Sequence, residues 1–401
     1  MSAAYSKGAR DVTTLAASAK GSFLDGVSYL RQLGAAKLLL LIALTGLLIG
    51  TSPETRGIIF ASLADAYLAV SVFVAATLGA IYYLEHKLDV DVAGLLRKYH
   101  RWQVPVAAAL GALPGCGGAV AVVTQYVRGS ISFGSLVAVL AATMGDAAFL
   151  LLAAEPTTGL LVFVLGFVVG SITGHVIDWI HGVDFLRADH PELPDQVARK
   201  PLPRLNKLRP VWAILLVPGL LLGILDLLQV DTDALFGPLA AFGPTEIIGV
   251  TGALLAFAMW TLDPELRFDP GVSRAGGAFT RTVDATNFVT VWVIVGFLVY
   301  ELGVHFSGID LAQLFDTYAP LIPLLAVLVG FLPGCGPQIV VTSLYITGAM
   351  PLSGQLANAI SNDGDALFPA LAIAPKAAAV ATIYSGIPAL IVGYGTYLFW
   401  G

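Results

Sequence analysis

The stretch LPGCG at residues 113–117 recurs unchanged at residues 332–336, and this duplication decides how the chain folds. At the same spacing of 219 positions, the stretch GDA at 145–147 recurs at 364–366. Over residues 113–156, 16 of 44 positions match the second copy without a gap. A shared apolar composition would give scattered Leu and Ala matches, not Pro, Gly, Cys and Asp in register. The chain therefore contains an internal repeat.

The composition places this repeat in a membrane. The 401 residues are 57% hydrophobic and only 12% charged, against about 45–50% and about 25% in soluble domains. So little charge cannot cover a soluble surface, and disorder requires the opposite balance. We therefore expect an all-α polytopic membrane protein. The Lys and Arg residues are scattered through loops and form no patch that would indicate nucleic-acid binding.

A membrane-spanning helix needs about 20 apolar residues, and the chain offers several such runs. They lie at 38–53, 66–84, 157–174, 211–225, 247–262, 285–300 and 377–401, while two longer stretches, 102–145 and 319–362, are each interrupted by LPGCG. This pattern predicts a cytoplasmic amphipathic arm (1–37), a first transmembrane repeat (38–181), a cytoplasmic linker with one connecting transmembrane helix (182–242) and a second repeat (243–401).

The distribution of Lys and Arg predicts how the repeats insert. If each LPGCG segment is a re-entrant hairpin, 20 of the 21 Lys and Arg lie on the same side as the amino terminus. If each segment crosses the membrane, they divide 10 to 11 and the repeats are parallel. The positive-inside rule favours the hairpins and a cytoplasmic amino terminus. Five crossings then separate equivalent elements, so the two repeats, of about five helical elements each, are inverted, as in many secondary transporters.

The LPGCG segment is the first candidate site. Proline removes a backbone donor and glycine permits unusual dihedral angles, so the helix must break there. Irregular backbone at membrane depth is tolerated only against protein or water. The only two cysteines of the chain, Cys116 and Cys335, both lie at this break, which favours a binding site over a plain hairpin tip. The predicted site includes the flanking glycines Gly115, Gly117, Gly334 and Gly336.

Acidic and amide side chains in the apolar runs are the second candidate. Asp146 and Asp365 follow the repeated glycine of GDA. An ionisable group in such a run costs at least about 2.5–3.5 kcal/mol, which predicts a substrate-binding role. A helix cap or a helix–helix contact is the alternative. Asn358 and Asn362 share a helical face with Asp365 if the helix is continuous, and we include them in the predicted site.

Other polar residues are candidates for ion coupling. We predict that Asp65, Asp284 or Asp363 carries coupling protons. The weaker candidates are Asn287, His175, Glu85 and Glu301, for which a solvated or structural role is the alternative.

The predicted donor set bears on the substrate. Thiolates suit soft metals and carboxylates suit manganese or magnesium, so a mixed set suits a transition metal of intermediate softness. Helices that begin after each break could instead direct their positive ends at an anion. The sequence contains no Walker, HExxH or CxxC motif, which favours secondary transport and argues against an enzyme.

The doubled LPGCG and GDA elements resemble those of the ten-transmembrane heavy-metal exporters, a family labelled both as manganese transporters and as arsenic efflux permeases. The resemblance covers the chain from about residue 35 to its end. It implies metal or metalloid efflux at the cytoplasmic (inner) membrane, with the paired cysteines and aspartates in the site. Pro337 stands where the first copy has Gly118, so the two half-sites need not be equivalent.

Three functions stay open. The leading hypothesis is a secondary transporter that exports a divalent heavy or transition metal, manganese-like or softer, coupled to protons. Its site would lie at the midplane between two repeats that rock against each other. The alternatives are an anion, oxyanion or arsenical permease that binds substrate at the hairpin helix N-termini, and an intramembrane enzyme with a cysteine nucleophile. We expect no resident cofactor besides the transported ion and no nucleic-acid partner. We expect the protein to reside in a lipid bilayer, where a homodimer is one oligomeric state open to it.

Overall fold

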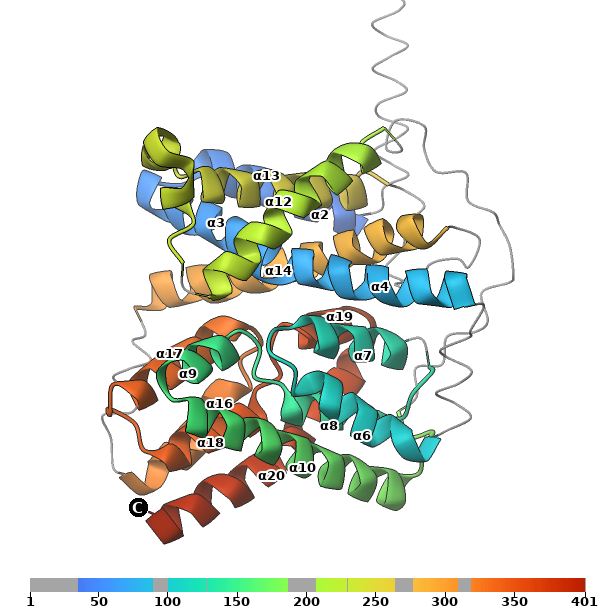
Figure 1. Ribbon diagram of the computed structural model, residues 1–401, viewed down its shortest axis with the longest axis vertical. Coiled ribbons are helices and arrows are strands. Elements are labelled where there is room, and N and C mark those ends of the chain that lie inside the picture. Colours follow the sequence, from blue (N-terminus) through green and yellow to red (C-terminus); the bar gives the residue numbers. More distant parts are fainter. Residues whose placement is uncertain are drawn as a thin grey trace, which may run out of the picture.

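The computed structural model describes residues 35–88, 100–127, 129–186, 207–228, 230–263, 277–308 and 319–400. These residues are helical and contain no strand. They form two lobes, one above the other in Figure 1. The predicted amphipathic arm lies, except for its last three residues, outside the described residues.

The upper lobe contains helices from three parts of the chain (Figure 1). Its elements are α2 (Ala35–Gly50), α3 (Pro53–Asp65), η1 (Ala66–Ser71), α4 (Val72–Leu88), α12 (Arg209–Leu227), η2 (Asp233–Phe242), α13 (Pro244–Thr261) and α14 (Ala278–Ser307). The apolar runs had suggested that a new span begins near residue 66. The structure instead has continuous helix from Pro53 to Leu88, with a π-helical stretch at η1. A single π-helical turn absorbs an extra residue without ending the helix.

The lower lobe contains one set of elements from each repeat (Figure 1). The first set is α6 (His100–Gly111), α7 (Gly117–Val127), α8 (Phe133–Ala142), α9 (Ala147–Ala154) and α10 (Pro156–His181). The second set is η3 (Ala319–Leu321) with α16 (Ile322–Gly330), then α17 (Cys335–Ile346), α18 (Leu352–Ser361), α19 (Leu367–Ile373) and α20 (Pro375–Trp400). Helix α8 is buried along its whole length and α18 along nearly all of it, so these two helices form the centre of the lobe.

The sequence repeat is also a repeat of backbone structure. Helices α8 and α18 begin and end at equivalent positions, and so do α10 and α20. Glycines with positive φ recur at the same spacing: Gly115 with Gly334, Gly129 with Gly348, and Gly145 with Gly364. Equivalent residues thus adopt equivalent conformations.

Contacts between the two sets are reciprocal. Helix α9 packs on α17 and the equivalent α19 packs on α7, while α8 packs on α20 and α18 packs on α10. Two pairs of equivalent side chains touch directly: the sulfur atoms of Cys116 and Cys335 are 3.3 Å apart, and Thr290 donates a hydrogen bond of 2.7 Å to Ser71. Reciprocal contacts of this kind define a two-fold relation, and here it lies within one chain.

Both repeated motifs break their helices. The backbone of Gly118 lies so close to α6 that a Cβ there would overlap the carbonyl oxygen of Leu110, so the chain reverses direction between α6 and α7. The second break separates α8 from α9 at residues 143–146, and its equivalent separates α18 from α19 at 362–366. The breaks predicted at LPGCG are therefore present.

The described helices are those of a multi-pass membrane protein. Seven are long and apolar enough to cross a bilayer: Pro53–Leu84, Phe133–Ala154, Pro156–His181, Arg209–Asp226, Pro244–Thr261, Ala278–Ser307 and Pro375–Phe399. Large apolar side chains such as Trp179, Phe306 and Phe399 are exposed on their outer faces, as lipid contact requires.

Candidate metal centre

Four side chains converge where the broken helices meet. Single ligand atoms of Cys116, Asp146, Cys335 and Asp365 all lie within 4.8 Å of one another. The two sulfur atoms are 3.3 Å apart, and both thiols donate to Oδ2 of Asp365, over 3.2 Å from Cys116 and 2.9 Å from Cys335. We call these four residues the Cys2Asp2 cluster. Both repeats contribute one thiol and one carboxyl group to it.

The helix breaks are what deliver these side chains. Cys116 lies in the turn between α6 and α7, and Cys335 is the first residue of α17. Asp146 immediately precedes α9, and Asp365 lies between α18 and α19. In the first repeat the N–H of Gly115 donates to the carbonyl of Gly145 over 3.1 Å, which ties one break to the other.

Gly145 is required by both conformation and space. Its φ is +52°, a backbone conformation that residues with a Cβ rarely adopt. A Cβ at this position would lie 2.6 Å from the sulfur of Cys335 and 3.6 Å from that of Cys116. The backbone therefore reaches the two thiols only because residue 145 has no side chain.

Helix ends at the cluster favour anionic ligand atoms held around a cation. Helices α7, α9 and α17 begin at or next to the cluster, and their positive ends stabilise thiolates and carboxylates. Oδ1 of Asp146 and Oδ1 of Asp365 are buried without a hydrogen-bond partner. A buried carboxylate oxygen without a donor is costly, and coordination of a cation would satisfy both.

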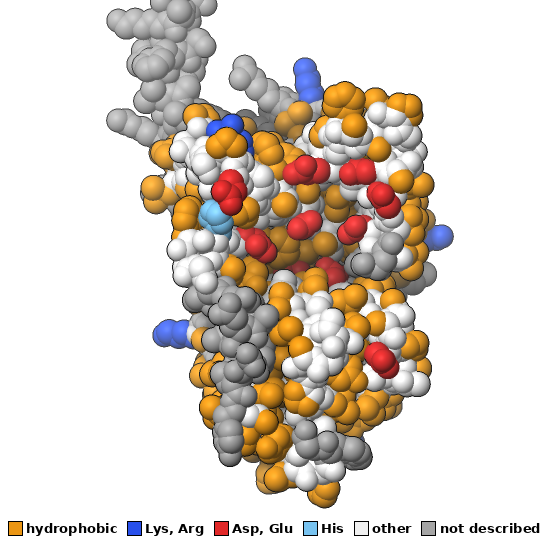
Figure 2. Space-filling model, turned by 90° about the vertical axis from the view of Figure 1, so that its left-hand side faces the viewer, with side chains coloured by type: hydrophobic (Ala, Val, Ile, Leu, Met, Phe, Trp, Pro, Cys, Tyr) orange, Lys and Arg blue, Asp and Glu red, His pale blue; other side chains and the backbone are white. Residues whose placement is uncertain are grey.

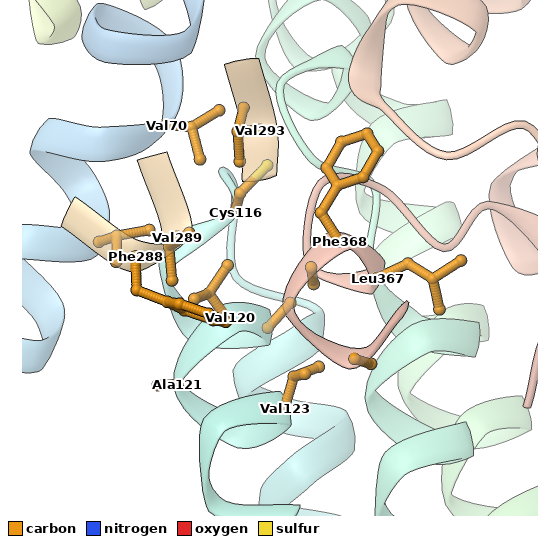
Figure 3. Close-up of a cluster of buried hydrophobic side chains, with 14 of the residues drawn as sticks. Val70, Cys116, Val120, Ala121, Val123, Phe288, Val289, Val293, Leu367 and Phe368 are labelled. Carbon is orange, nitrogen blue, oxygen red and sulfur yellow. The ribbon is translucent and has the colours of Figure 1, made fainter. Parts of the chain in front are cut away.

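The cluster lies where the two lobes meet, inside an apolar shell. In Figure 3 the Cys116 turn passes between Val70 and Val293 of the upper lobe and Phe368 of α19. The thiols and Asp365 are buried, and Asp146 is partly exposed. An apolar shell around charged ligands lowers the local dielectric and strengthens their attraction for a cation.

The spacing fits a small four-coordinate site. Ligands that surround zinc at about 2.0–2.3 Å in a tetrahedron lie about 3.3–3.8 Å from each other, close to the separations in the cluster. The cysteines are free thiols rather than a disulfide, whose sulfur atoms would be about 2.05 Å apart.

The two predicted asparagines lie beside the cluster rather than in it. Helix α18 ends at Ser361, so Asp365 does not share a helical face with Asn358 and Asn362. The shared face was expected only for a continuous helix, and the helix ends before Asp365. The side chain of Asn358 donates to the carbonyl of Ala326, and both asparagines are fully buried.

The three predicted coupling aspartates occupy different surroundings. Asp363 lies in the same break as Asp365 and accepts hydrogen bonds from Thr382 and Ser385. Asp284 forms an ion pair with Arg209 over 3.0 Å.

Asp65, the third of them, belongs to a group of acidic side chains on the upper lobe. It lies within electrostatic reach of Asp226, Glu246 and Glu301, and Asp146 of the cluster lies within reach of Asp65. We call Asp65, Asp226, Glu246 and Glu301 the acidic rim. Figure 2 shows acidic side chains gathered around a hollow between the two lobes.

The remaining predicted residues are dispersed. Glu301 belongs to the acidic rim, Asn287 is buried in α14, and His175 is exposed on α10. The side chain of Glu85 is outside the described part of the chain.

Some polar residues near the site were not predicted. Gln338 and Gln355 are fully buried in the second repeat, and the equivalent positions of the first repeat hold Ala119 and Leu136. A comparison of the two copies for differences, and not only for matches, would have found them. Asp226 and Glu246 lie near helix ends and carried no signal of their own.

Comparison with known families identifies one match. The family described as "Putative, 10TM heavy-metal exporter" matches residues 54–400, which include every residue of the Cys2Asp2 cluster. No curated protein and no solved structure matches the chain significantly.

Proposed function

Because this chain belongs to the family of ten-transmembrane heavy-metal exporters, we propose that it exports a divalent transition or heavy metal through the Cys2Asp2 cluster. The observation that supports this most is the convergence of two thiols and two carboxyl groups from opposite repeats within 4.8 Å. Four anionic ligands with two sulfurs suit divalent ions from manganese-like to softer, and sulfur favours zinc and its heavier congeners.

The acidic rim supports a cationic substrate. Carboxylates around a hollow raise the local concentration of cations and speed their association, while they repel anions. The rim residues Asp226, Glu246 and Glu301 lie within electrostatic reach of Asp65 and add to this field. These charges disfavour an anion near Asp146, which lies within electrostatic reach of Asp65 and Asp226.

We further propose that the two repeats are inverted in the inner membrane and that the amino terminus is cytoplasmic. The positive-inside rule supports this arrangement. If α6–α7 and α16–α17 each enter and leave on the same face, 20 of the 21 Lys and Arg lie on one side, whereas full crossings divide them 10 to 11. The reversal at Gly118 and the two-fold contacts between the repeats support this arrangement. The Cys2Asp2 cluster then lies within the bilayer where the broken helices of both repeats meet, as in inverted-repeat transporters.

Protons are the natural coupling ions at the cluster itself. Metals bind thiolates and carboxylates, so a metal that arrives displaces the protons that these groups carry. A proton gradient can thus drive exchange at the same four side chains. We assign relay of these protons to Asp65, at the acidic rim, and to Asp363, in the break that also carries Asp365.

Metal binding to purified protein tests the proposal. We expect isothermal titration to detect Zn²⁺, Cd²⁺ or Mn²⁺ binding, and Cys116→Ser with Cys335→Ser to weaken Cd²⁺ binding by about 100-fold or more because sulfur is lost. Asp178→Asn is the matched control, since Asp178 accepts hydrogen bonds from Ser132 and Gly134 in the same lobe but lies outside the cluster. Unchanged Cd²⁺ affinity and proteoliposome transport in the double serine variant would refute the proposal.

One observation favours a second candidate, an oxyanion or arsenical permease. Three helix N-termini are directed at the cluster, and such ends bind anions. Arsenite, arsenate and Cd²⁺ should therefore be titrated separately. Binding of an arsenical without competition from Cd²⁺ would favour this alternative.

A further inference from the structure

The two repeats differ sharply in polarity beside the Cys2Asp2 cluster. In the second repeat, the face between α16, α17 and α18 carries four fully buried amide side chains. They are Gln338, Gln355, Asn358 and Asn362, and the equivalent positions of the first repeat hold Ala119, Leu136, Val139 and Thr143. At these four positions the same backbone thus carries three apolar side chains and one threonine in the first repeat, and four amides in the second. The fold does not require these amides, so they need another explanation.

Three of the amides share one face of α18 and its end. Gln355, Asn358 and Asn362 follow one another at spacings of three and four, which places them on one side of the helix. Each uses its NH2 group as a donor: Gln355 to Thr342 over 3.2 Å, Asn358 to the carbonyl of Ala326 over 2.9 Å, and Asn362 to Gln338 over 2.8 Å.

In each of these three amides the oxygen is left buried without a donor. These atoms are Oε1 of Gln355, Oδ1 of Asn358 and Oδ1 of Asn362. A buried acceptor without a partner is costly. Nε2 of Gln338 is also buried without a partner, so the four amides leave three acceptors and one donor unpaired, and this excess of acceptors favours a ligand that offers positive charge.

The helix ends add to this negative potential. Helix α16 ends at Gly330 and α18 ends at Ser361. These two ends touch, because a Cβ on Gly330 would overlap the side chain of Ser361. The C-terminal end of a helix carries a partial negative charge, and two such ends at one place favour a cation, as at the cation sites of transporters with broken helices.

We propose that this face is a second cation site that binds Na⁺ or a similarly hard monovalent cation through the oxygens of Gln355, Asn358 and Asn362. The donors are neutral oxygens, which suit a hard cation, and the absence of a carboxylate among them favours a single over a double charge. The nearby Asp363 is held by Thr382 and Ser385. The break that carries Asn362 also carries Asp365 of the Cys2Asp2 cluster, so the two sites are joined by a short stretch of chain.

The two repeats supply the test variant. Asn358→Val with Asn362→Thr introduces the side chains that the first repeat carries at equivalent positions. Full-length protein in detergent is heated in NaCl, KCl or choline chloride at equal ionic strength. We expect Na⁺, and neither K⁺ nor choline, to raise the unfolding temperature of the wild type saturably, by about 5 °C at saturation. The double variant should lose this rise and keep its Cd²⁺ affinity in KCl.

Asn287→Val is the matched control, since Asn287 is a buried asparagine in α14 of the upper lobe. It should keep the response to Na⁺. If the double variant does not fold, Na⁺ binding is measured by ²³Na NMR instead. We expect the wild type to broaden the ²³Na line and Gln355→Leu to broaden it less. A wild type that responds equally to all three cations, or a double variant that keeps the Na⁺-specific rise, overturns the inference. Cd²⁺ titration in KCl tests metal binding at the Cys2Asp2 cluster without Na⁺. It therefore distinguishes failure of the Na⁺ site from failure of the proposed export function.

Discussion

At the scale of single residues, the site depends on what Gly145 lacks as much as on what the cysteines supply. The backbone of residue 145 can lie against the thiol of Cys335 only because Gly145 has no Cβ. A glycine next to an aspartate in an apolar run is thus part of the binding site, although it has no ligand atom.

We predict that Gly145→Ala weakens Cd²⁺ binding by about 10–100-fold, the range for changes that displace metal ligands without removing them. Gly348→Ala is a close control. It too replaces a glycine with positive φ, here +76°, but in open space where no atom lies within 4 Å. Both variants carry the same kind of backbone strain, so only the first should change affinity by titration. Equal losses would show that strain rather than contact with the thiols is responsible.

The four acidic ligands also predict a pH dependence. Metal binding must displace protons from thiols and carboxyl groups, so the apparent affinity for Cd²⁺ should rise with pH. Titrations in buffers of different ionisation enthalpy should show net proton release. Binding without proton release at any pH would contradict a role for the thiols as ligands.

At the scale of secondary-structure elements, equivalent residues of the two repeats make different interactions. Asp65 and Asp284 occupy equivalent positions, yet Asp284 pairs with Arg209 and joins α12 to α14, while Asp65 belongs to the acidic rim. Equivalence in sequence therefore does not imply equivalence in function.

We predict opposite effects of removing these two charges. Asp284→Asn should lower stability by about 2 kcal/mol, because Arg209 loses its charged partner in a mostly buried setting, and should leave Cd²⁺ affinity unchanged. Asp65→Asn should leave the unfolding temperature nearly unchanged and slow transport most at low ionic strength. Thermal unfolding and proteoliposome flux separate the two. A stability loss confined to Asp65→Asn would reverse our assignment.

What could be predicted from the sequence was set by local backbone chemistry. A Pro-Gly pair alone does not end a helix, since Pro218 and Gly219 lie inside α12. The recurrence of the whole LPGCG element predicted the breaks at Cys116 and Cys335 and the meeting of the two cysteines. The continuous helix through Asp65 could not be predicted, because whether a π-helical turn absorbs an extra residue depends on packing against α14. Of the four buried amides, Asn358 and Asn362 were predicted as site residues, whereas Gln338 and Gln355 were missed, because a single Gln is unremarkable in an apolar helix and only the fold brings the four together.

At the scale of the whole molecule, the two-fold relation between the repeats can be tested by forming a disulfide between Cys116 and Cys335. With sulfur atoms 3.3 Å apart, mild oxidation should form an intramolecular Cys116–Cys335 disulfide and abolish metal binding, and reduction should restore both thiols and binding. Peptide mass mapping after proteolysis measures the bond, and bound Cd²⁺ should slow its formation. Disulfides formed only between molecules would show that the repeats do not meet as described.

The division into lobes also bears on how the ion would move. All four ligands of the Cys2Asp2 cluster belong to the lower lobe, although they come from both repeats. Rocking one repeat against the other would divide the coordination sphere in two and leave the ion with half of its ligands. A shift of the lower lobe as one rigid body along α4 and α14 would instead move the ion together with all four of its ligands.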